Sequence, residues 1–155
     1  MTAPYLHHRV ITWGDTDAAQ IVYTVRFFDF AMEAIEGWFR SVLGLDWYAL
    51  NIDRHIGTPF VNVAMDISAP LTPRDHLCCA VHVERLGRAS LTLRVLGRKE
   101  DGTESFDARH TCCFVNSQSM TAIPVPPEFR TPIEAYCGAG GGITPRAPRR
   151  EAESA

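Results

Sequence analysis

The sequence lacks several features that would assign it to a common class of protein. Its 155 residues contain no run of about 18 apolar residues, so no membrane-spanning helix is predicted. Lysine and arginine number 15 against 18 aspartate and glutamate residues, and this balance argues against a protein that binds nucleic acid. The first ten residues, MTAPYLHHRV, lack the basic and then apolar order of an export signal. We therefore expect a cytoplasmic protein.

The cysteines and histidines do not form a pattern that predicts a metal site. The five cysteines are two adjacent pairs, Cys78-Cys79 and Cys112-Cys113, plus Cys137, and no C-x-x-C occurs. Adjacent residues of a strand point to opposite faces of a sheet, so the two thiols of a pair cannot bind one metal ion together. No histidine has a metal-ligand spacing with another ligand residue. We expect reduced, half-buried cysteines and no bound metal.

The first half of the chain predicts a short strand followed by one long helix. Residues 8–13 alternate as in a strand, which the acidic segment 14–17 ends. From about residue 24 to residue 43 apolar side chains recur at steps of three and four, the period of an amphipathic helix, and Gly44 is a plausible stop. Apolar residues occupy much of the circumference of this helix, so other structure should enclose it.

Beyond residue 57 apolar and polar residues alternate, as in strands that bury one face. His110 falls on the apolar side of this alternation. Strands are predicted at 61–67, 77–83, 90–95 and 106–114, with a short edge strand at 120–123. The order of elements predicts an α+β fold in which one antiparallel sheet of five to six strands wraps around one long helix.

The chain is long enough for one hydrophobic core, and we assign residues 1–137 to a single domain. From Gly138 onward the sequence has little to bury, which predicts a flexible C-terminal tail over residues 138–155. One sheet cannot cover the helix on all sides, and it leaves an exposed edge strand. We therefore expect a homodimer or homotetramer.

Two carboxylates, Asp15 and Asp17, precede the long helix. Capping of unpaired backbone N–H groups would account for Asp15. Asp17 sits where a loop can point a side chain into a cleft that also receives the free N–H groups of the first helical turn. Hydrolysis of a thioester needs these two components: a general base or nucleophile, and hydrogen-bond donors for the developing oxyanion. The donors would be backbone N–H groups near Tyr23 and Thr24, but the residues alone leave this assignment open.

The segment resembles the hot-dog thioesterases of the 4-hydroxybenzoyl-CoA thioesterase type and their relatives associated with the Tol-Pal system. The matching residues are Trp13, Gly14, Asp15, Asp17, Ile21, Val22 and Tyr23, followed by the helix that carries Phe27 and Phe28. Similarity extends over roughly residues 8–130 and includes Gly44-Leu45-Asp46-Trp47, Gly57-Thr58-Pro59 and Leu86-Gly87-Arg88-Ala89-Ser90. The resemblance implies a hot-dog fold, a coenzyme A thioester as the substrate with no separate cofactor, and Asp17 as the catalytic carboxylate.

The resemblance also implies how the substrate binds. The phosphates of coenzyme A require Arg or Lys, and Arg88 matches the phosphate-binding position of the family. Ser90 and Thr58 are candidate hydrogen-bond partners of the substrate. An apolar acyl pocket suited to a benzoyl-type group is expected beside the long helix at a subunit interface, lined by Trp13, Tyr23, Phe27 and Trp47.

Three residues depart from the family pattern: Gln20 stands where the family usually has Gly, Thr24 where it has His or Tyr, and Arg26 where many members have Asn. These departures favour an alternative hypothesis, a non-catalytic acyl-CoA-binding protein. A hot-dog hydratase or dehydratase ranks lower because the loop has no Asp-x-x-x-x-His arrangement. No Gly-x-Ser-x-Gly occurs, which argues against a serine hydrolase.

Overall fold

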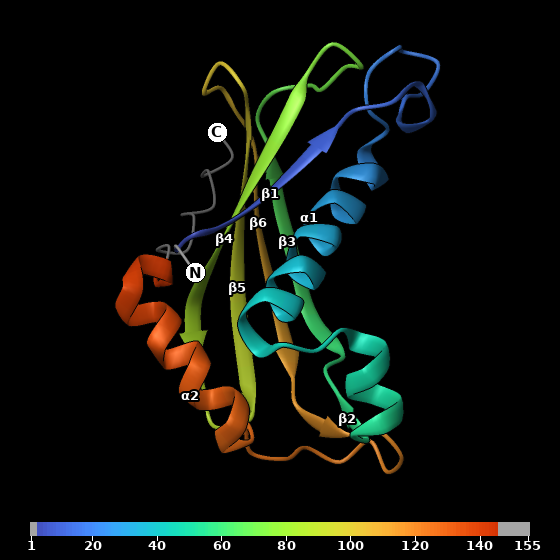
Figure 1. The fold of residues 1–155 in the computed structure, drawn as a ribbon. Helices are drawn as coiled ribbons and strands as arrows, with labels where there is room; N and C mark the ends of the chain where they lie inside the picture. The colour runs from blue at the N-terminus through green and yellow to red at the C-terminus, as the bar shows by residue number, and fades with distance from the viewer. Residues whose placement is uncertain (1–2, 146–155) are drawn as a thin grey trace, which may run out of the picture.

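The computed structural model describes residues 3–145 as one antiparallel sheet with a long helix against one face and a shorter helix at one end (Figure 1). The sheet has five strands in the order β1-β4-β5-β6-β3, so β1 and β3 are its edges. Their bounds are Tyr5–Val10 (β1), Phe60–Ile67 (β3), His76–Leu86 (β4), Ser90–Lys99 (β5) and Glu104–Cys113 (β6). Two short strands, β2 (Ile56–Gly57) and β7 (Val115–Asn116), pair separately. The predicted sheet around one helix is confirmed.

The long helix follows the predicted course. α1 (Thr24–Trp38) continues as a π-helical segment, Phe39–Leu43, and ends at Gly44, whose φ of 74° is a left-handed conformation that favours glycine. The apolar side chains at steps of three and four pack against the sheet and are buried: Phe27, Phe30, Ala31, Ala34, Ile35 and Trp38. Full burial of a large apolar side chain stabilises the fold by about 1.5–3 kcal/mol, so this face accounts for the position of the helix.

β4 and β6 show the predicted alternation of buried and less buried residues, whereas β3 does not, because Val61, Val63 and Ile67 are exposed. Cys79 and Cys112 are buried in the core, while their neighbours Cys78 and Cys113 are half-buried on the opposite face. All five cysteines are free, and burial raises the pKa of the Cys79 and Cys112 thiols to about 12. His110 lies on the packed face, where burial lowers its pKa to about 4. The imidazole is therefore neutral near pH 7.

The C-terminal part of the domain differs from the prediction. Residues 120–123 do not form an edge strand: Ala122 makes one isolated bridge to Val115, and prolines follow. The chain instead forms a helix that the alternation did not predict, α2 (Pro127–Tyr136), with Phe129, Ile133 and Tyr136 buried. Proline at residue 127 suits the first turn of a helix, because the N–H groups there have no partner within the helix.

Part of the segment predicted as a tail packs against the domain. Cys137–Gly141 prolongs α2 as a π-helical segment, Gly141 is buried, and the Ile143 N–H donates to the Val83 carbonyl at 3.0 Å. Residues 146–155, the rest of the predicted tail, lie outside the described residues. Within residues 3–145 no helix is both long and apolar enough to cross a membrane.

Candidate active site

Asp17 lies at the start of a tight turn that joins a short 3-10 helix, Trp13–Asp15, to α1. The turn is closed by a bridge between Thr16 and Val22, and the Asp17 N–H donates to the Ile21 carbonyl at 3.0 Å. The Asp17 side chain is exposed, and its Oδ1 accepts a hydrogen bond from the Ala19 N–H at 2.8 Å. No other donor among residues 3–145 contacts this carboxylate. Its Oδ2 therefore remains open to a water molecule or a substrate.

Asp15 has the opposite environment. Its side chain is 1% exposed, and its carboxylate accepts hydrogen bonds from Arg9, Arg26 and Thr12 at 2.7–3.2 Å. Burial alone would raise the pKa of Asp15, but the hydrogen bonds from Arg9, Thr12 and Arg26 outweigh it and hold the pKa well below its usual range. The structural role expected for Asp15 is confirmed, although the backbone N–H that its carboxylate binds is that of Thr12 and not one of the first turn of α1.

One of the two expected oxyanion donors is already engaged. The Tyr23 N–H donates to the Asp15 carbonyl at 2.9 Å, so this group is not available to a substrate. Thr24 is the first residue of α1, and its N–H belongs to the first turn, which has no acceptor within the helix. The Thr24 N–H therefore remains the candidate donor, and the positive end of the helix dipole favours an anion beside it.

The other predicted substrate-binding residues lie at the far end of the molecule. Asp17, Tyr23 and Thr24 precede or begin α1, whereas Trp47, Thr58, Arg88 and Ser90 follow its C-terminal end or belong to the β2 and β4–β5 turns (Figure 1). α1 has 15 residues and is therefore about 22 Å long. One chain thus does not bring the two groups together. The expected acyl pocket does not form within a chain either, because Phe27 is buried in the core and Trp13 is 74% exposed in the loop.

A pocket of about 340 Å³ occupies the far end. It is lined mainly by apolar side chains with a few polar groups: Met32, Trp47, Asn51, Gly57, Thr58, Pro59, Phe60, Ser117 and Met120. The Trp47 ring packs edge-on against Phe60 at 6.0 Å, and its buried Nε1 has no hydrogen-bond partner in the described part of the chain. Trp47 and Thr58 are among the predicted substrate-binding residues, whereas Asn51 and Ser117 are not, because no motif marks them in the sequence.

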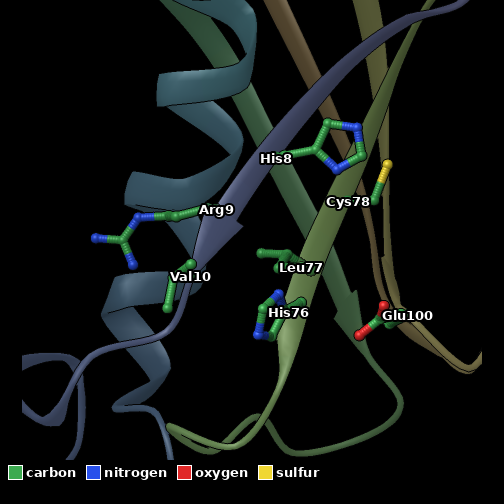
Figure 2. Close-up of a pocket in the computed structure, with 7 residues that line it drawn as sticks. All are labelled: His8, Arg9, Val10, His76, Leu77, Cys78 and Glu100. Atoms are coloured by element: carbon green, nitrogen blue, oxygen red, sulfur yellow. The ribbon is translucent and has the colours of Figure 1, made fainter.

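A second pocket lies beside β1 and β4, on the face of the sheet away from α1 (Figure 2). Figure 2 shows His8 next to Cys78, its partner across the two strands, while Arg9 points the other way, toward α1. His76 and Glu100 complete its polar lining. No group of three or more His, Cys, Asp or Glu residues between residues 3 and 145 has an arrangement that could hold a metal ion.

Comparison with known proteins identifies the family. Residues 11–133 match the model of the thioesterase-like superfamily, and the chain belongs to this family. A 1,4-dihydroxy-2-naphthoyl-CoA hydrolase of Synechococcus elongatus is 29% identical over 126 residues, which cover 80% of this chain and 90% of the relative.

Solved structures give the same result. A thioesterase superfamily protein from Jannaschia sp. CCS1 is 38% identical, has a TM-score of 0.81, and covers 86% of this chain and 92% of its own. A gentisyl-coenzyme A thioesterase is 27% identical with a TM-score of 0.72, and covers 81% of this chain and 98% of its own. The hot-dog fold predicted from the loop motif and the strand pattern is confirmed.

Proposed function

We propose that this protein hydrolyses acyl-coenzyme A thioesters with an aromatic acyl group, and that Asp17 is the catalytic carboxylate. The observation that carries the proposal is the exposed Asp17 carboxylate, with one oxygen held by the Ala19 N–H and the other open, in the turn that leads into α1. Membership of the thioesterase-like superfamily and relatives that act on naphthoyl-CoA and gentisyl-CoA support the reaction and the acyl group.

The chemistry needs a nucleophile on one side of the thioester carbonyl and a donor for its oxygen. Asp17 Oδ2 either removes a proton from an attacking water molecule or attacks the carbonyl carbon itself. The Thr24 N–H donates to the carbonyl oxygen, which gains negative charge as the new bond forms. The carbon–sulfur bond then breaks and the coenzyme A thiolate leaves. In the general-base route the free acid forms directly, and the thiolate takes up the proton that Asp17 removed from water. In the nucleophilic route water hydrolyses the mixed anhydride formed with Asp17, which frees the acid and the carboxylate, and a proton from this water goes to the thiolate. Coenzyme A is part of the substrate, and no separate cofactor takes part.

We further propose that two copies of the chain complete each site. β3 is an edge strand that begins at Phe60, which lines the Trp47–Thr58 pocket. It ends four residues before Leu71, whose carbonyl accepts the Val22 N–H of the Asp17 turn. If two β3 edges pair in antiparallel orientation about a two-fold axis, the Asp17 end of each copy lies beside the pocket end of the other.

Exposed apolar side chains support this arrangement. One set surrounds the Asp17 turn and the start of α1, and a second set lies on β3 and near the pocket: Val10, Trp13, Ile21, Tyr23 and Val25 in the first, and Tyr48, Ile52, Val61, Val63 and Met120 in the second. An interface would remove both sets from water. In the resulting homodimer, Trp47 and Thr58 contact the acyl group, and Arg88 and Ser90 are placed at the coenzyme A phosphates. The five free cysteines suit a reducing compartment, which supports a cytoplasmic location.

The test is a thiol-release assay with benzoyl-CoA, hydroxylated benzoyl-CoA, and short-chain and long-chain acyl-CoAs. It compares wild type with Asp17→Asn and with a control, Glu36→Gln, which removes a carboxylate paired with Arg40 at the other end of α1. We expect turnover of the aryl thioesters that is lost in Asp17→Asn and kept in Glu36→Gln. Turnover that survives in Asp17→Asn would remove this residue from its role. Binding of acyl-CoA without any turnover would favour the alternative, a non-catalytic binding protein.

A further inference from the structure

The buried Asp15 carboxylate joins three elements of the fold through one group of side chains, which we call the Asp15 clamp: Arg9, Thr12, Asp15 and Arg26. Asp15 Oδ2 accepts from Arg9 Nη1 at 2.7 Å and from the Thr12 N–H at 2.8 Å. Asp15 Oδ1 accepts from Arg26 Nη2 at 2.7 Å and from Arg26 Nε at 3.2 Å. Arg9 comes from β1 and Arg26 from the first turn of α1, so the clamp fixes the loop to both.

Both arginines are themselves held from a second side. The Arg9 guanidinium lies 4.2 Å from the centre of the Phe30 ring and donates from Nε to Glu33 at 2.8 Å (Figure 2 shows Arg9 directed toward α1). Arg26 Nη1 donates to Asp29 at 2.7 Å. Each guanidinium therefore has little freedom to turn away from Asp15, and the clamp is a rigid connection.

The clamp brackets the turn that carries Asp17. The Asp15 N–H donates to the Thr12 carbonyl at 3.0 Å, and the Asp15 carbonyl accepts from the Tyr23 N–H at 2.9 Å. Asp15 immediately precedes Thr16, and Tyr23 immediately follows Val22, so both ends of the bridged turn are attached to one buried residue. Within the turn, the side chains from Asp17 to Ile21 are exposed and none belongs to the hydrophobic core. The direction of the Asp17 carboxylate thus depends on how the two ends of the turn are held.

We infer that Arg26, together with Arg9, acts through Asp15 as a positioning residue for Asp17, so that the clamp sets the rate of turnover rather than substrate affinity. This inference rests on the proposed function. It also gives a reason for Arg26, which stands where many family members have Asn: the guanidinium reaches Asp15 with two donors and Asp29 with a third. A displacement of about 1 Å at a catalytic group can lower a rate about 100-fold, whereas affinity is set by contacts elsewhere.

The kinetic test compares Arg26→Ala, Arg26→Lys and a control, Arg40→Ala, which removes an arginine paired with Glu36 just beyond α1. We expect Arg26→Ala to lower kcat about 10-fold to 100-fold with KM changed less than about two-fold. Arg26→Lys keeps the charge but offers no fork of donors, so it should restore kcat only in part. Arg40→Ala should leave both constants unchanged. Equal kcat per folded enzyme in wild type and Arg26→Ala, with only a lower unfolding temperature, would overturn the inference.

A second readout does not depend on turnover. Hydrogen–deuterium exchange of peptides that cover residues 16–23 should become faster in Arg26→Ala than in wild type, while peptides of β5 and β6 should stay protected. Unchanged exchange of the turn in Arg26→Ala would overturn the inference even if kcat falls, because the arginine would then act in another way. If wild type hydrolyses no thioester, the proposed function fails, and the exchange result alone decides whether the clamp holds the turn.

Discussion

Asp15 and Asp17 are separated by one residue, yet they occupy opposite environments. Asp15 is buried and its carboxylate is saturated by donors from two arginines and a threonine. Asp17 is exposed and accepts from one backbone N–H. A carboxylate whose oxygens are all bound has no lone pair left for a proton or a carbonyl carbon, whereas one with an open oxygen does. The difference indicates a structural role for Asp15 and a catalytic role for Asp17. Each of these two roles can be tested.

The largest effect is expected from Asp17→Asn. Loss of a general base or a nucleophile should lower kcat by about 1,000-fold or more. The free energy of unfolding should change by less than about 0.5 kcal/mol, because the side chain is exposed and Asn keeps an oxygen that can accept from the Ala19 N–H. Steady-state kinetics and urea unfolding on one preparation measure both quantities. A loss of stability as large as the loss of activity would show that Asp17 supports the fold.

In contrast to Asp17→Asn, Asp15→Asn should have a large effect on the free energy of unfolding. The change leaves two guanidinium groups without their shared partner beside the core, and breaking a buried ion pair costs about 3–5 kcal/mol. Urea unfolding measures the loss, and Asp29→Asn is the matched control because its carboxylate is half exposed and contacts only one of the two arginines. Similar losses in the two variants would contradict the central place of Asp15.

The pH dependence of stability should report the ionisation of the buried Asp15 carboxylate. Because the pKa of Asp15 is lower in the folded state than its ordinary value of 3.8, its contribution is fully present above about pH 4 and is lost as the pH falls toward the folded pKa. The slope attributable to one such group is at most about 1.4 kcal/mol per pH unit. Urea midpoints from pH 7 to pH 2 should fall more steeply in wild type than in Asp15→Asn. Parallel curves would show that Asp15 titrates alike in both states.

The sequence predicted the elements with strong periodicity and failed where periodicity is weak. The course of α1 could be predicted because its buried face appears in the sequence as apolar residues at steps of three and four. Its end could be predicted because a left-handed residue there is usually a glycine, here Gly44. α2 carries its buried residues among prolines, including Pro132 within the helix, so the local pattern does not predict a helix there.

Some residues of the candidate site can be proposed from the sequence, but their geometry cannot. The acidic pair and the departure at Arg26 are visible in the sequence, but the pairing of Arg26 with Asp15 depends on how α1 meets the loop. The engagement of the Tyr23 N–H depends on the same packing. The separation of Asp17 from Trp47 by the length of α1 follows from the fold, and contacts of this kind have no local signature in a sequence.

Among the changes to the Asp15 clamp, the smallest effect on the free energy of unfolding is expected from removal of one hydroxyl group, that of Thr12. The Thr12 Oγ1 donates to Asp15 Oδ2 at 3.0 Å, and Thr12→Val removes this hydrogen bond while it keeps the backbone N–H that binds the same oxygen. Loss of one hydrogen bond to a charged group costs about 1.5–3 kcal/mol, and the exposure of Thr12 places the expected loss in urea unfolding at the lower end, about 1.5 kcal/mol.

Thr16→Val is the control, because its hydroxyl bonds the Trp13 carbonyl at 2.7 Å and does not contact Asp15. This variant should lose less than about 0.5 kcal/mol, as is usual for surface substitutions. Equal losses in the two variants would mean that the hydroxyl groups of Thr12 and Thr16 contribute equally to the free energy of unfolding. The hydrogen bond to the Asp15 carboxylate would then have no special importance for the stability of the loop. A larger loss in Thr12→Val would instead show that hydrogen bonds to the buried Asp15 carboxylate stabilise this loop. Asp17, two residues away, would then not be needed to stabilise it.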